Sequence, residues 1–376
     1  MDGATLAGRI WRPGIGPCLV TLRQGEVIDI TARAAPTMRD LLELDDPAAY
    51  VRTAPGSAVC ALSDLVAASR PDAGPDDLRF LAPCDLQAVK AAGVTFARSM
   101  VERVIEERAA GDPDRAAGIR ARIGAVIGES LRNLRPGSPE AAKVKRLLQN
   151  EGLWSQYLEV GIGPDAEIFT KAQPMSAVGH GAAVGLHPVS RWNNPEPEVV
   201  LACDSRGRIR GATLGNDVNL RDVEGRSALL LGKAKDNNAA ASVGPFVRLF
   251  DAGFTLDDVR RTEVALTVEG TDGFRMTGRS SMAEISRDPA DLAAQACGRH
   301  HQYPDGFFLY CGTMFAPVQD RDAPGQGFTH HAGDVVTIAA EGLGELVNTV
   351  RLSTEAPEWT FGTAALMRNL AARGLI

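Results

Sequence analysis

The sequence predicts an α+β protein, mainly β, with a small β-rich N-terminal domain over residues 1–78 and a larger domain over residues 79–376. Residues 8–31 alternate apolar and polar side chains, which is the pattern of a small antiparallel hairpin or meander. After residue 155 the chain becomes a series of short β-prone runs separated by Gly, Asn, Asp and Pro. Residues 67–78 are rich in Pro, Gly, Asp and Ala, a composition typical of a linker, so we place the domain boundary there.

The N-terminal hairpin is expected to turn at Gln24-Gly25. Apolar residues at helical spacing predict helices between the two β-rich regions, one of them after a Pro-Gly-Ser-Pro breaker. The expected helices are residues 35–44, 94–111, 114–133, 138–150 and 365–374. The expected strands of the larger domain are residues 157–162, 198–204, 209–214, 263–270, 307–313 and 334–340.

Composition excludes several classes of partner. The chain has 40 Lys and Arg against 47 Asp and Glu, a net charge of −7, and these charges are scattered, which argues against nucleic acid or an anionic membrane as partner. No apolar run is long enough to span a bilayer, and the N-terminus lacks the pattern of a signal peptide. The six cysteines lie far apart without a CxxC pair, which fits a reducing compartment. We therefore expect a cytoplasmic protein.

One strand carries an unusual pair of acids. Glu196 and Glu198 are two residues apart in NNPEPEVVLACD, so both carboxylates project from the same face. Their repulsion is relieved most simply by a hard divalent cation, although a solvated edge strand without a ligand is the ordinary alternative. Asp217, in a Gly-Asn-Asp turn beyond an expected hairpin turn at Arg206-Gly207, can bring a third carboxylate beside the pair. Such a set of oxygen ligands suits Mg²⁺ or Mn²⁺ better than zinc.

These motifs resemble those of a known family. PEPE at residues 195–198, GNDVNLRD at residues 215–222 and the following Lys235 together resemble the fumarylacetoacetate hydrolase superfamily, over residues 85–376. The resemblance implies the mixed β-sandwich roll of that family in a catalytic domain, with the two glutamates and the aspartate as metal ligands. It also implies a homodimer or homotetramer.

The resemblance also bears on the reaction. Hydrolases of the superfamily that cleave a carbon–carbon bond carry a His near the start of the domain, but residues 93–107 here contain none, so water has no evident activator. That segment and the PGQGFTH stretch resemble the sugar-acid dehydratase branch. This implies conversion of 2-keto-3-deoxy-D-xylonate, the same compound as 2-keto-3-deoxy-D-arabinonate, to 2-oxoglutarate semialdehyde and water in oxidative pentose catabolism.

The resemblance assigns two catalytic residues. Lys235 is the candidate base at C3, and we expect burial near a cation to lower the pKa of its amine. Lys233 is its competitor and would share its face in a strand. Glu167, in DAEIFTK, is the candidate acid for the departing C4 hydroxyl, because apolar neighbours raise the pKa of a carboxyl group.

Four more residues are candidates for substrate binding. Arg221 and Thr313 match positions that face the substrate or order the site in relatives, although Arg221 has the alternative of bracing its own loop. Ser99 and Arg103, one turn apart on the expected helix, are candidates for binding the distal hydroxyl or a carboxylate, and an ordinary helix surface is the alternative for Ser99.

Two sets of residues remain open. Glu106 or Glu107 could replace the missing His, although a solvated helical face is the simpler interpretation. His180 and His187 could line a loop over the site or be structural. Two other functions also remain open, namely an acylpyruvate or fumarylacetoacetate-type hydrolase or oxaloacetate decarboxylase, and a non-catalytic metal-stabilised interaction protein.

Overall fold

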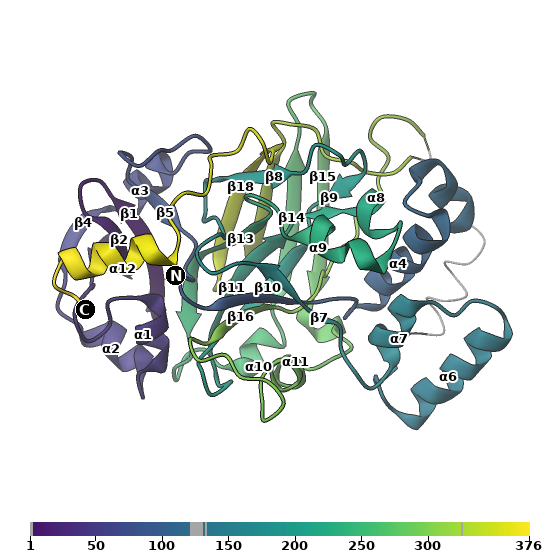
Figure 1. Cartoon of the computed structure of the whole chain (residues 1–376), viewed down its shortest axis with the longest axis horizontal. Helices are drawn as coiled ribbons and strands as arrows, with labels where there is room; N and C mark the ends of the chain where they lie inside the picture. The colour runs from purple at the N-terminus through teal and green to yellow at the C-terminus, as the bar shows by residue number, and fades with distance from the viewer. Residues whose placement is uncertain (1–2, 121–130, 132–133, 325) are drawn as a thin grey trace.

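A computed structural model describes residues 3–120, 131, 134–324 and 326–376. Two β-sheets form the centre of the molecule, with helices gathered at its two ends (Figure 1). In sheet order, the strands of the large sheet are β4 (Ser57–Ala61), β3 (Glu26–Asp29), β2 (Gly16–Arg23), β1 (Leu6–Arg12), β13 (Ala241–Leu249), β11 (Ile209–Asp217), β10 (Pro197–Cys203), β16 (Phe307–Tyr310), β6 (Ala88–Ala92) and β7 (Ile168–Ala172), with β5 (Arg79–Leu81) also paired to β1.

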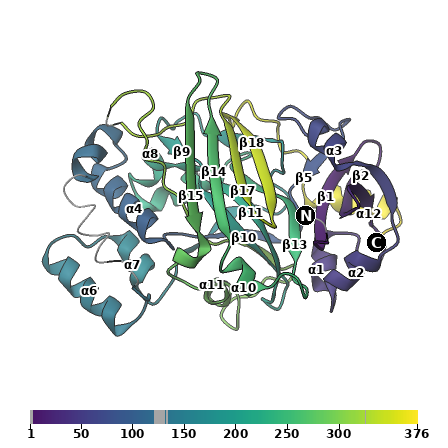
Figure 2. The ribbon, with the colours of Figure 1, turned by 180° about the vertical axis from the view of Figure 1, so that it is seen from behind.

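The second sheet covers one face of the large sheet, as the reverse view shows (Figure 2). Its strands, in order, are β15 (Arg275–Ser281), β14 (Glu263–Glu269), β17 (Val335–Ala340), β18 (Gly344–Leu352) and β8 (Ala183–Leu186), and the short strands β9 (Asn193–Asn194) and β12 (Asn219–Leu220) form a separate pair. The helices are α1 (Met38–Glu43), α2 (Pro47–Thr53), α3 (Leu62–Ala68), α4 (Ala97–Ala109), α6 (Pro139–Asn150), α7 (Gln156–Ile162), α8 (Arg221–Glu224), α9 (Leu231–Lys235), α10 (Leu256–Val259), α11 (Pro289–Ala296) and α12 (Thr363–Ala372), with 3₁₀ turns at Ala228–Leu230 and Met282–Glu284.

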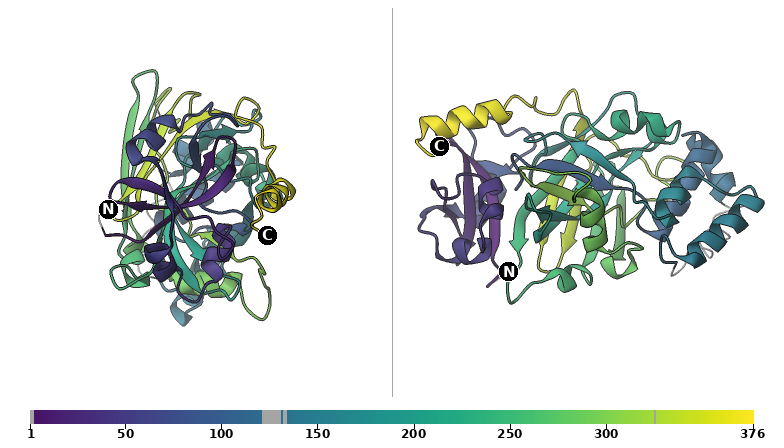
Figure 3. Two further views of the ribbon diagram at one scale, coloured as in Figure 1. Left: turned by 90° about the vertical axis from the view of Figure 1, so that its left-hand side faces the viewer. Right: turned by 60° about the horizontal axis from the view of Figure 1, so that its bottom comes forward.

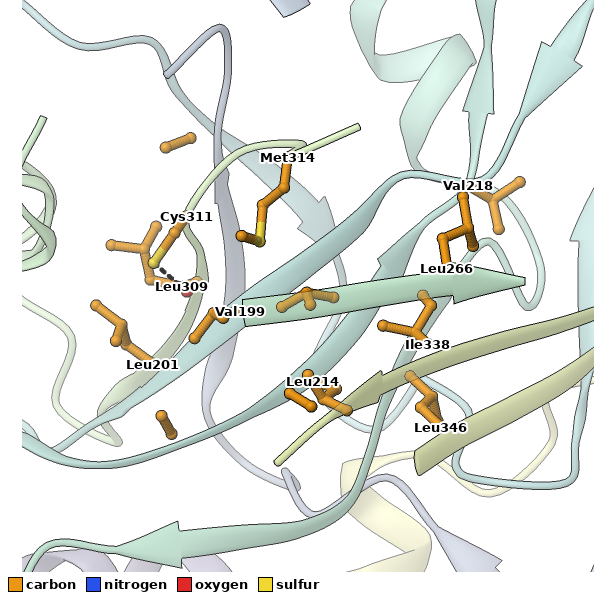
Figure 4. Packing of buried hydrophobic residues seen from close by; sticks show 14 of the residues in the cluster. Val199, Leu201, Leu214, Val218, Leu266, Leu309, Cys311, Met314, Ile338 and Leu346 are labelled. Carbon is orange, nitrogen blue, oxygen red and sulfur yellow. Dashed lines mark hydrogen bonds between the residues drawn. The ribbon is translucent and has the colours of Figure 1, made fainter. Parts of the chain in front are cut away.

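The alternation of side chains along β10 explains why two layers form. Val199 and Leu201 enter a core that also contains Ile338 of β17, between the two sheets (Figure 4). Val200 and Ala202 point to the opposite face of the same strand, into a second core. Because every residue of β10 is buried, the strand lies at the centre of the molecule and fixes the position of the acids at its start. The expected α+β sandwich roll is therefore confirmed.

Most of the expected elements are confirmed, including the N-terminal hairpin and the helices α4, α6 and α12. The strand expected at residues 157–162 is wrong, because this segment is helix α7. The Ser155 hydroxyl caps it by accepting the amide N–H of Tyr157, and Leu158 and Ile162 pack against α4 at helical spacing. Of the helix expected at residues 114–133, residues 113–120 are helical, and residues 121–130 and 132–133 lie outside the described residues.

Residues 69–78 contain no helix or strand, as expected of a linker. The large sheet nevertheless continues across this segment, because β1 pairs with β13 as well as with β5. The C-terminal helix α12 also lies against the N-terminal strands (Figure 3), where Asn369 donates to the carbonyl of Ile15 at 2.7 Å. The division at residue 78 stays a prediction. Among the described residues, no helix combines the length and hydrophobicity needed to cross a membrane.

Candidate metal centre and active site

Three acids meet where β10 begins and β11 ends. The hairpin turn at Arg206-Gly207 pairs the two strands, and the backbone N–H of Asp217 donates to the carbonyl of Glu196 at 3.0 Å. Carboxylate oxygens of Glu196, Glu198 and Asp217 all lie within 4.8 Å of one another, and all three residues are buried. The predicted triad is thus brought together. Asp217 is the last residue of a strand, however, and not part of a turn as expected.

Each acid of the triad is held by donors from other elements. Lys235 Nζ contacts Glu196 Oε2 at 2.5 Å and Asp217 Oδ2 at 3.1 Å, and Lys171 Nζ contacts Asp217 Oδ1 at 2.7 Å. Arg103 contacts the other oxygen of Glu196.

Glu198 is held by the backbone instead. The N–H of Gly312, which follows β16, donates to Glu198 Oε2 at 2.6 Å. Gly312 has φ +99°, and a Cβ at this position would lie 2.0 Å from Thr95 Oγ1, so the close approach requires glycine.

The pKa values of the triad follow from burial and charge. Burial raises the pKa of Glu198, and repulsion from Asp217 and Glu196 raises it further, to well above its ordinary value. Burial opposes ionisation of Asp217 as well, but Lys171 and Lys235 outweigh it and lower the pKa of that carboxyl group. The lysines around the triad therefore favour ionisation of Asp217, whereas Glu198 resists ionisation because it is buried beside two other carboxylates.

The wider ion-pair network supports this conclusion. Seven acids surround the triad or belong to it, against five bases among the described residues. The acids are Glu102, Glu106, Glu167, Glu196, Glu198, Asp217 and Glu224, and the bases are Arg103, Arg120, Lys171, Arg221 and Lys235. Carboxylates crowded together with fewer basic partners favour a divalent cation, because the cation offsets their repulsion.

Two small cavities adjoin the triad, each of about 10 Å³. The first, which we name the triad cavity, is lined by Ala92, Gly93, Val94, Arg103, Glu167, Phe169, Glu196, Glu198, Asp217, Glu224, Lys235 and Thr313. The second, the Ser99 cavity, is lined by Ser99, Glu102, Arg103, Glu106, Asn194, Glu196, Arg221, Thr313 and Ala316. All the predicted site residues therefore line one cavity or both. A larger hollow of about 190 Å³ lies between the N-terminal strands and residues 357–361 and contains none of them.

The surroundings of the two candidate catalytic residues, Glu167 and Lys235, shift their pKa values for different reasons. Burial raises the pKa of Glu167, as expected for an acid. Burial alone would lower the pKa of Lys235, but the carboxylates of Asp217 and Glu196 outweigh it and raise the pKa; the expected lowering assumed a bound cation and stays a prediction. Lys233 does not share the face of Lys235, because the segment is helix α9, and it lies exposed with Nζ 3.4 Å from His187 Nε2.

The candidate substrate-binding residues already have partners within the chain. Arg221 is fully buried, donates to the Pro317 carbonyl at 2.9 Å and pairs with Glu106 at 2.6 Å, which is the bracing arrangement. The hydroxyl of Ser99 is buried rather than on the helix surface, and donates to the Phe96 carbonyl at 2.8 Å. Thr313 Oγ1 donates to the Phe315 carbonyl at 3.1 Å and lines both cavities.

The open alternatives are narrowed by burial. Glu106 lies between Arg103 and Arg221, which together lower its pKa against the effect of burial, so it is a counter-ion and not a solvated residue or a base. Glu107 accepts from the Ser155 hydroxyl. Nδ1 of buried His180 lies 2.9 Å from the carbonyl oxygen of Glu345 and 3.3 Å from the backbone nitrogen of Val347, away from the cavities, and half-buried His187 lines neither of them.

Sequence reasoning missed two charged residues of the site. Lys171 has no exposed surface, and its Nζ also donates to the carbonyls of Lys235 at 2.6 Å and Val218 at 3.1 Å. The strand period gives a signal for it, because Phe169 and Lys171 are two residues apart in β7, and Glu167, directly before the strand, continues the same spacing. Glu224 lies three residues after Arg221 in the GNDVNLRDVE run, and burial raises its pKa to about 7 despite Arg103 and Lys235.

The comparisons agree with this geometry. The family model described as "Fumarylacetoacetate (FAA) hydrolase C-terminal" matches residues 164–351, half of the chain. The chain belongs to the fumarylacetoacetate hydrolase superfamily. Its matched half contains the triad, Glu167 and Lys235.

Two curated proteins that are similar in sequence to this chain are named as dehydratases. A "Probable 2-keto-3-deoxyxylonate dehydratase" of Haloferax volcanii is 32% identical over 194 residues, 52% of this chain and 63% of that protein. A "2-dehydro-3-deoxy-D-arabinonate dehydratase" of Saccharolobus solfataricus is 29% identical over 188 residues, 49% of this chain and 58% of that protein. The similarity thus spans about three fifths of the length of each curated relative.

Solved structures confirm the fold. A 2-keto-3-deoxy-D-arabinonate dehydratase complexed with magnesium and 2,5-dioxopentanoate has a TM-score of 0.62 at 20% identity, covering 92% of this chain and 99% of that one. A fumarylacetoacetate hydrolase from Exiguobacterium antarcticum has a TM-score of 0.55 at 16% identity, with coverage of 92% and 99%. The fold of this superfamily thus extends over most of the chain, including its N-terminal β region.

Proposed function

We propose that this protein is a Mg²⁺- or Mn²⁺-dependent dehydratase that converts 2-keto-3-deoxy-D-pentonate to 2-oxoglutarate semialdehyde and water. The observation that carries the proposal is the buried triad of Glu196, Glu198 and Asp217 in one cavity with Lys235 and Glu167. Both curated relatives that share half of the chain are named as dehydratases of such keto-acids, which supports the substrate class.

The triad fits a hard divalent cation. Its donors are all carboxylate oxygens, and repulsion from Asp217 and Glu196 raises the pKa of Glu198, a repulsion that a bound cation would relieve. Mg²⁺ and Mn²⁺ prefer such oxygen ligands, whereas zinc sites usually include His or Cys. When bound, the cation would supply a Lewis acid that polarises the C2 ketone and so acidifies the protons on C3.

The side chains of this chain then divide the proton transfers. Lys235, as a neutral amine, takes a proton from C3. The carboxylates beside Lys235 raise the pKa of its amine, so a neutral amine requires a metal cation that offsets their charge. Glu167, kept protonated by burial, gives its proton to the C4 hydroxyl, which leaves as water while a C3–C4 double bond forms. A proton then moves from C5 to C3 to give an enol, and the enol hydroxyl proton moves to C4, so C5 becomes the aldehyde; one water is lost and no redox cofactor is consumed.

A hydrolase of the same fold is the second candidate, and the cavities favour the dehydratase over it. Hydrolysis of a carbon–carbon bond requires a base that activates water, and no described residue that lines either cavity is a histidine. Glu106, which could replace it, is held as a counter-ion between two arginines. We also propose a homodimer or homotetramer, which the mass in solution would establish.

The test is product formation by the purified protein. With Mg²⁺ and 2-keto-3-deoxy-D-pentonate, proton NMR should show an aldehyde signal that appears in step with loss of the substrate, and Glu198→Gln should abolish it while leaving the circular dichroism spectrum unchanged. No aldehyde from the wild-type protein with either Mg²⁺ or Mn²⁺ would refute the assignment. Pyruvate released from an acylpyruvate or from oxaloacetate would instead support the second candidate.

A further inference from the structure

Arg103 connects three acids from three segments of the chain. From helix α4, one terminal nitrogen contacts Glu106 Oε2 at 2.7 Å and Glu224 Oε2 at 3.2 Å, and the other contacts Glu196 Oε1. The side chain is only 8% exposed. One of these three acids, Glu196, belongs to the triad, so Arg103 and a metal ion would share the same carboxylate.

Both oxygens of Glu196 are engaged by cations of the chain. Lys235 holds Oε2 and Arg103 holds Oε1. A divalent cation that binds Glu196 therefore competes with Arg103 and Lys235 for the same two oxygens, and its positive charge repels both side chains. Arg103 can lose its contact with Glu196 and still be paired, because Glu106 and Glu224 remain beside its guanidinium.

Arg103 also divides the space next to the triad. The triad cavity and the Ser99 cavity share Arg103, Glu196 and Thr313 as lining residues. Each holds about 10 Å³, which is room for roughly one water molecule and not for a five-carbon acid. Movement of the guanidinium away from Glu196 would join the two cavities into a single chamber that runs from the triad to Ser99.

We propose that Arg103 couples metal binding to substrate binding, because its guanidinium releases Glu196 when a divalent cation binds and then contacts the substrate. The released guanidinium then remains with Glu106 and Glu224 and faces the joined chamber, where its free donors bind the distal hydroxyls of the keto-acid. Metal and substrate therefore bind in order, metal first. This inference rests on the proposed function for the identity of the substrate, but its metal-binding half does not.

The first test is calorimetric titration of Mg²⁺ into the protein without substrate. Arg103→Gln removes the competitor for Glu196, so Mg²⁺ should bind about ten- to a hundredfold more tightly, the size expected for loss of one charge-assisted hydrogen bond. Arg103→Lys keeps the charge but cannot bridge three carboxylates, and should fall between that variant and the wild type. Arg108→Gln is the matched control, because Arg108 lies on the same helix and, among the described residues, its side chain donates to the carbonyl of Gly152 at 2.7 Å and not to a carboxylate of the triad.

The second test separates the two ends of the substrate. In Arg103→Gln the KM for the full keto-acid should rise about tenfold, whereas inhibition by 2-oxobutanoate, which lacks both distal hydroxyls, should be unchanged. Equal Mg²⁺ affinity in the wild type, Arg103→Gln and Arg103→Lys, with all three folded, would overturn the coupling. Mg²⁺ binding that survives Glu198→Gln would overturn the metal site itself, so the two failures are distinguishable.

Discussion

Replacing Lys171 with methionine tests how the triad is held. Lys171 has no exposed surface, and its ammonium pairs with Asp217 Oδ1 at 2.7 Å and donates to the carbonyls of Val218 and Lys235. Methionine has a similar length but no charge, so the change leaves a buried carboxylate with one partner fewer and two carbonyls without this donor. Removing one partner of a buried pair costs about 3–5 kcal/mol, and we expect the free energy of unfolding to fall by that amount.

The assay is urea denaturation at pH 7 without added divalent cation, which gives the free energy of unfolding by linear extrapolation to zero urea. The slope of this free energy against urea concentration is compared between the proteins. Lys90→Met on the neighbouring strand β6 is the matched control, because Lys90 is more exposed, donates to Thr170 Oγ1 at 2.8 Å, and should cost less than about 1 kcal/mol. Mg²⁺ should restore more stability to Lys171→Met than to the wild type, because the cation no longer competes with Lys171 for Asp217. A loss below about 1 kcal/mol in Lys171→Met would refute the view that a charged pair holds this carboxylate.

Two further predictions concern catalysis and the position of Glu198. If Glu167 is the acid, it must be protonated, so wild-type activity should fall as the pH rises through its raised pKa. This loss at alkaline pH should be absent from the residual activity of Glu167→Gln, whose Mg²⁺ affinity should be unchanged. The same loss at alkaline pH in the variant would exclude the role. Gly312→Ala should cost about 1–3 kcal/mol in unfolding free energy, because its Cβ would meet Thr95. It should also weaken Mg²⁺ binding, because the backbone N–H that donates to Glu198 would shift. Gly232→Ala is the control and should be tolerated, because a Cβ there meets nothing within 4 Å; equal stability of the two variants would contradict the requirement for glycine at position 312.

The triad was predictable because it depends on local geometry. Strand period two places Glu196 and Glu198 on one face, and a tight hairpin brings the end of the partner strand, with Asp217, beside them. Alternation and turn residues likewise predicted the N-terminal hairpin and the strands β10, β11, β14, β16 and β17, because these rules act over a few residues. The segment 157–162 was mistaken for a strand because its β-prone composition carried no information on its packing against α4.

The charge network around the triad was less predictable. Lys171, Glu224 and Arg103 come from three separate segments, and only the tertiary fold determines that they meet. Helical spacing proposed Arg103, and the family resemblance proposed Arg221, as substrate ligands, but neither could show that each is already paired with acids of the chain. The direction of the pKa shift of Lys235 has the same origin, since it depends on the balance of burial against carboxylates that are distant in sequence.

The most direct test of the central claim is a crystal structure of the protein with Mn²⁺ and 2-oxobutanoate, with the metal located by its anomalous signal. We expect one Mn²⁺ bound by Glu196, Glu198 and Asp217, with Arg103 no longer in contact with Glu196 and the joined chamber open toward Ser99. Mn²⁺ at another position, in crystals of protein whose activity depends on Mn²⁺, would contradict the account.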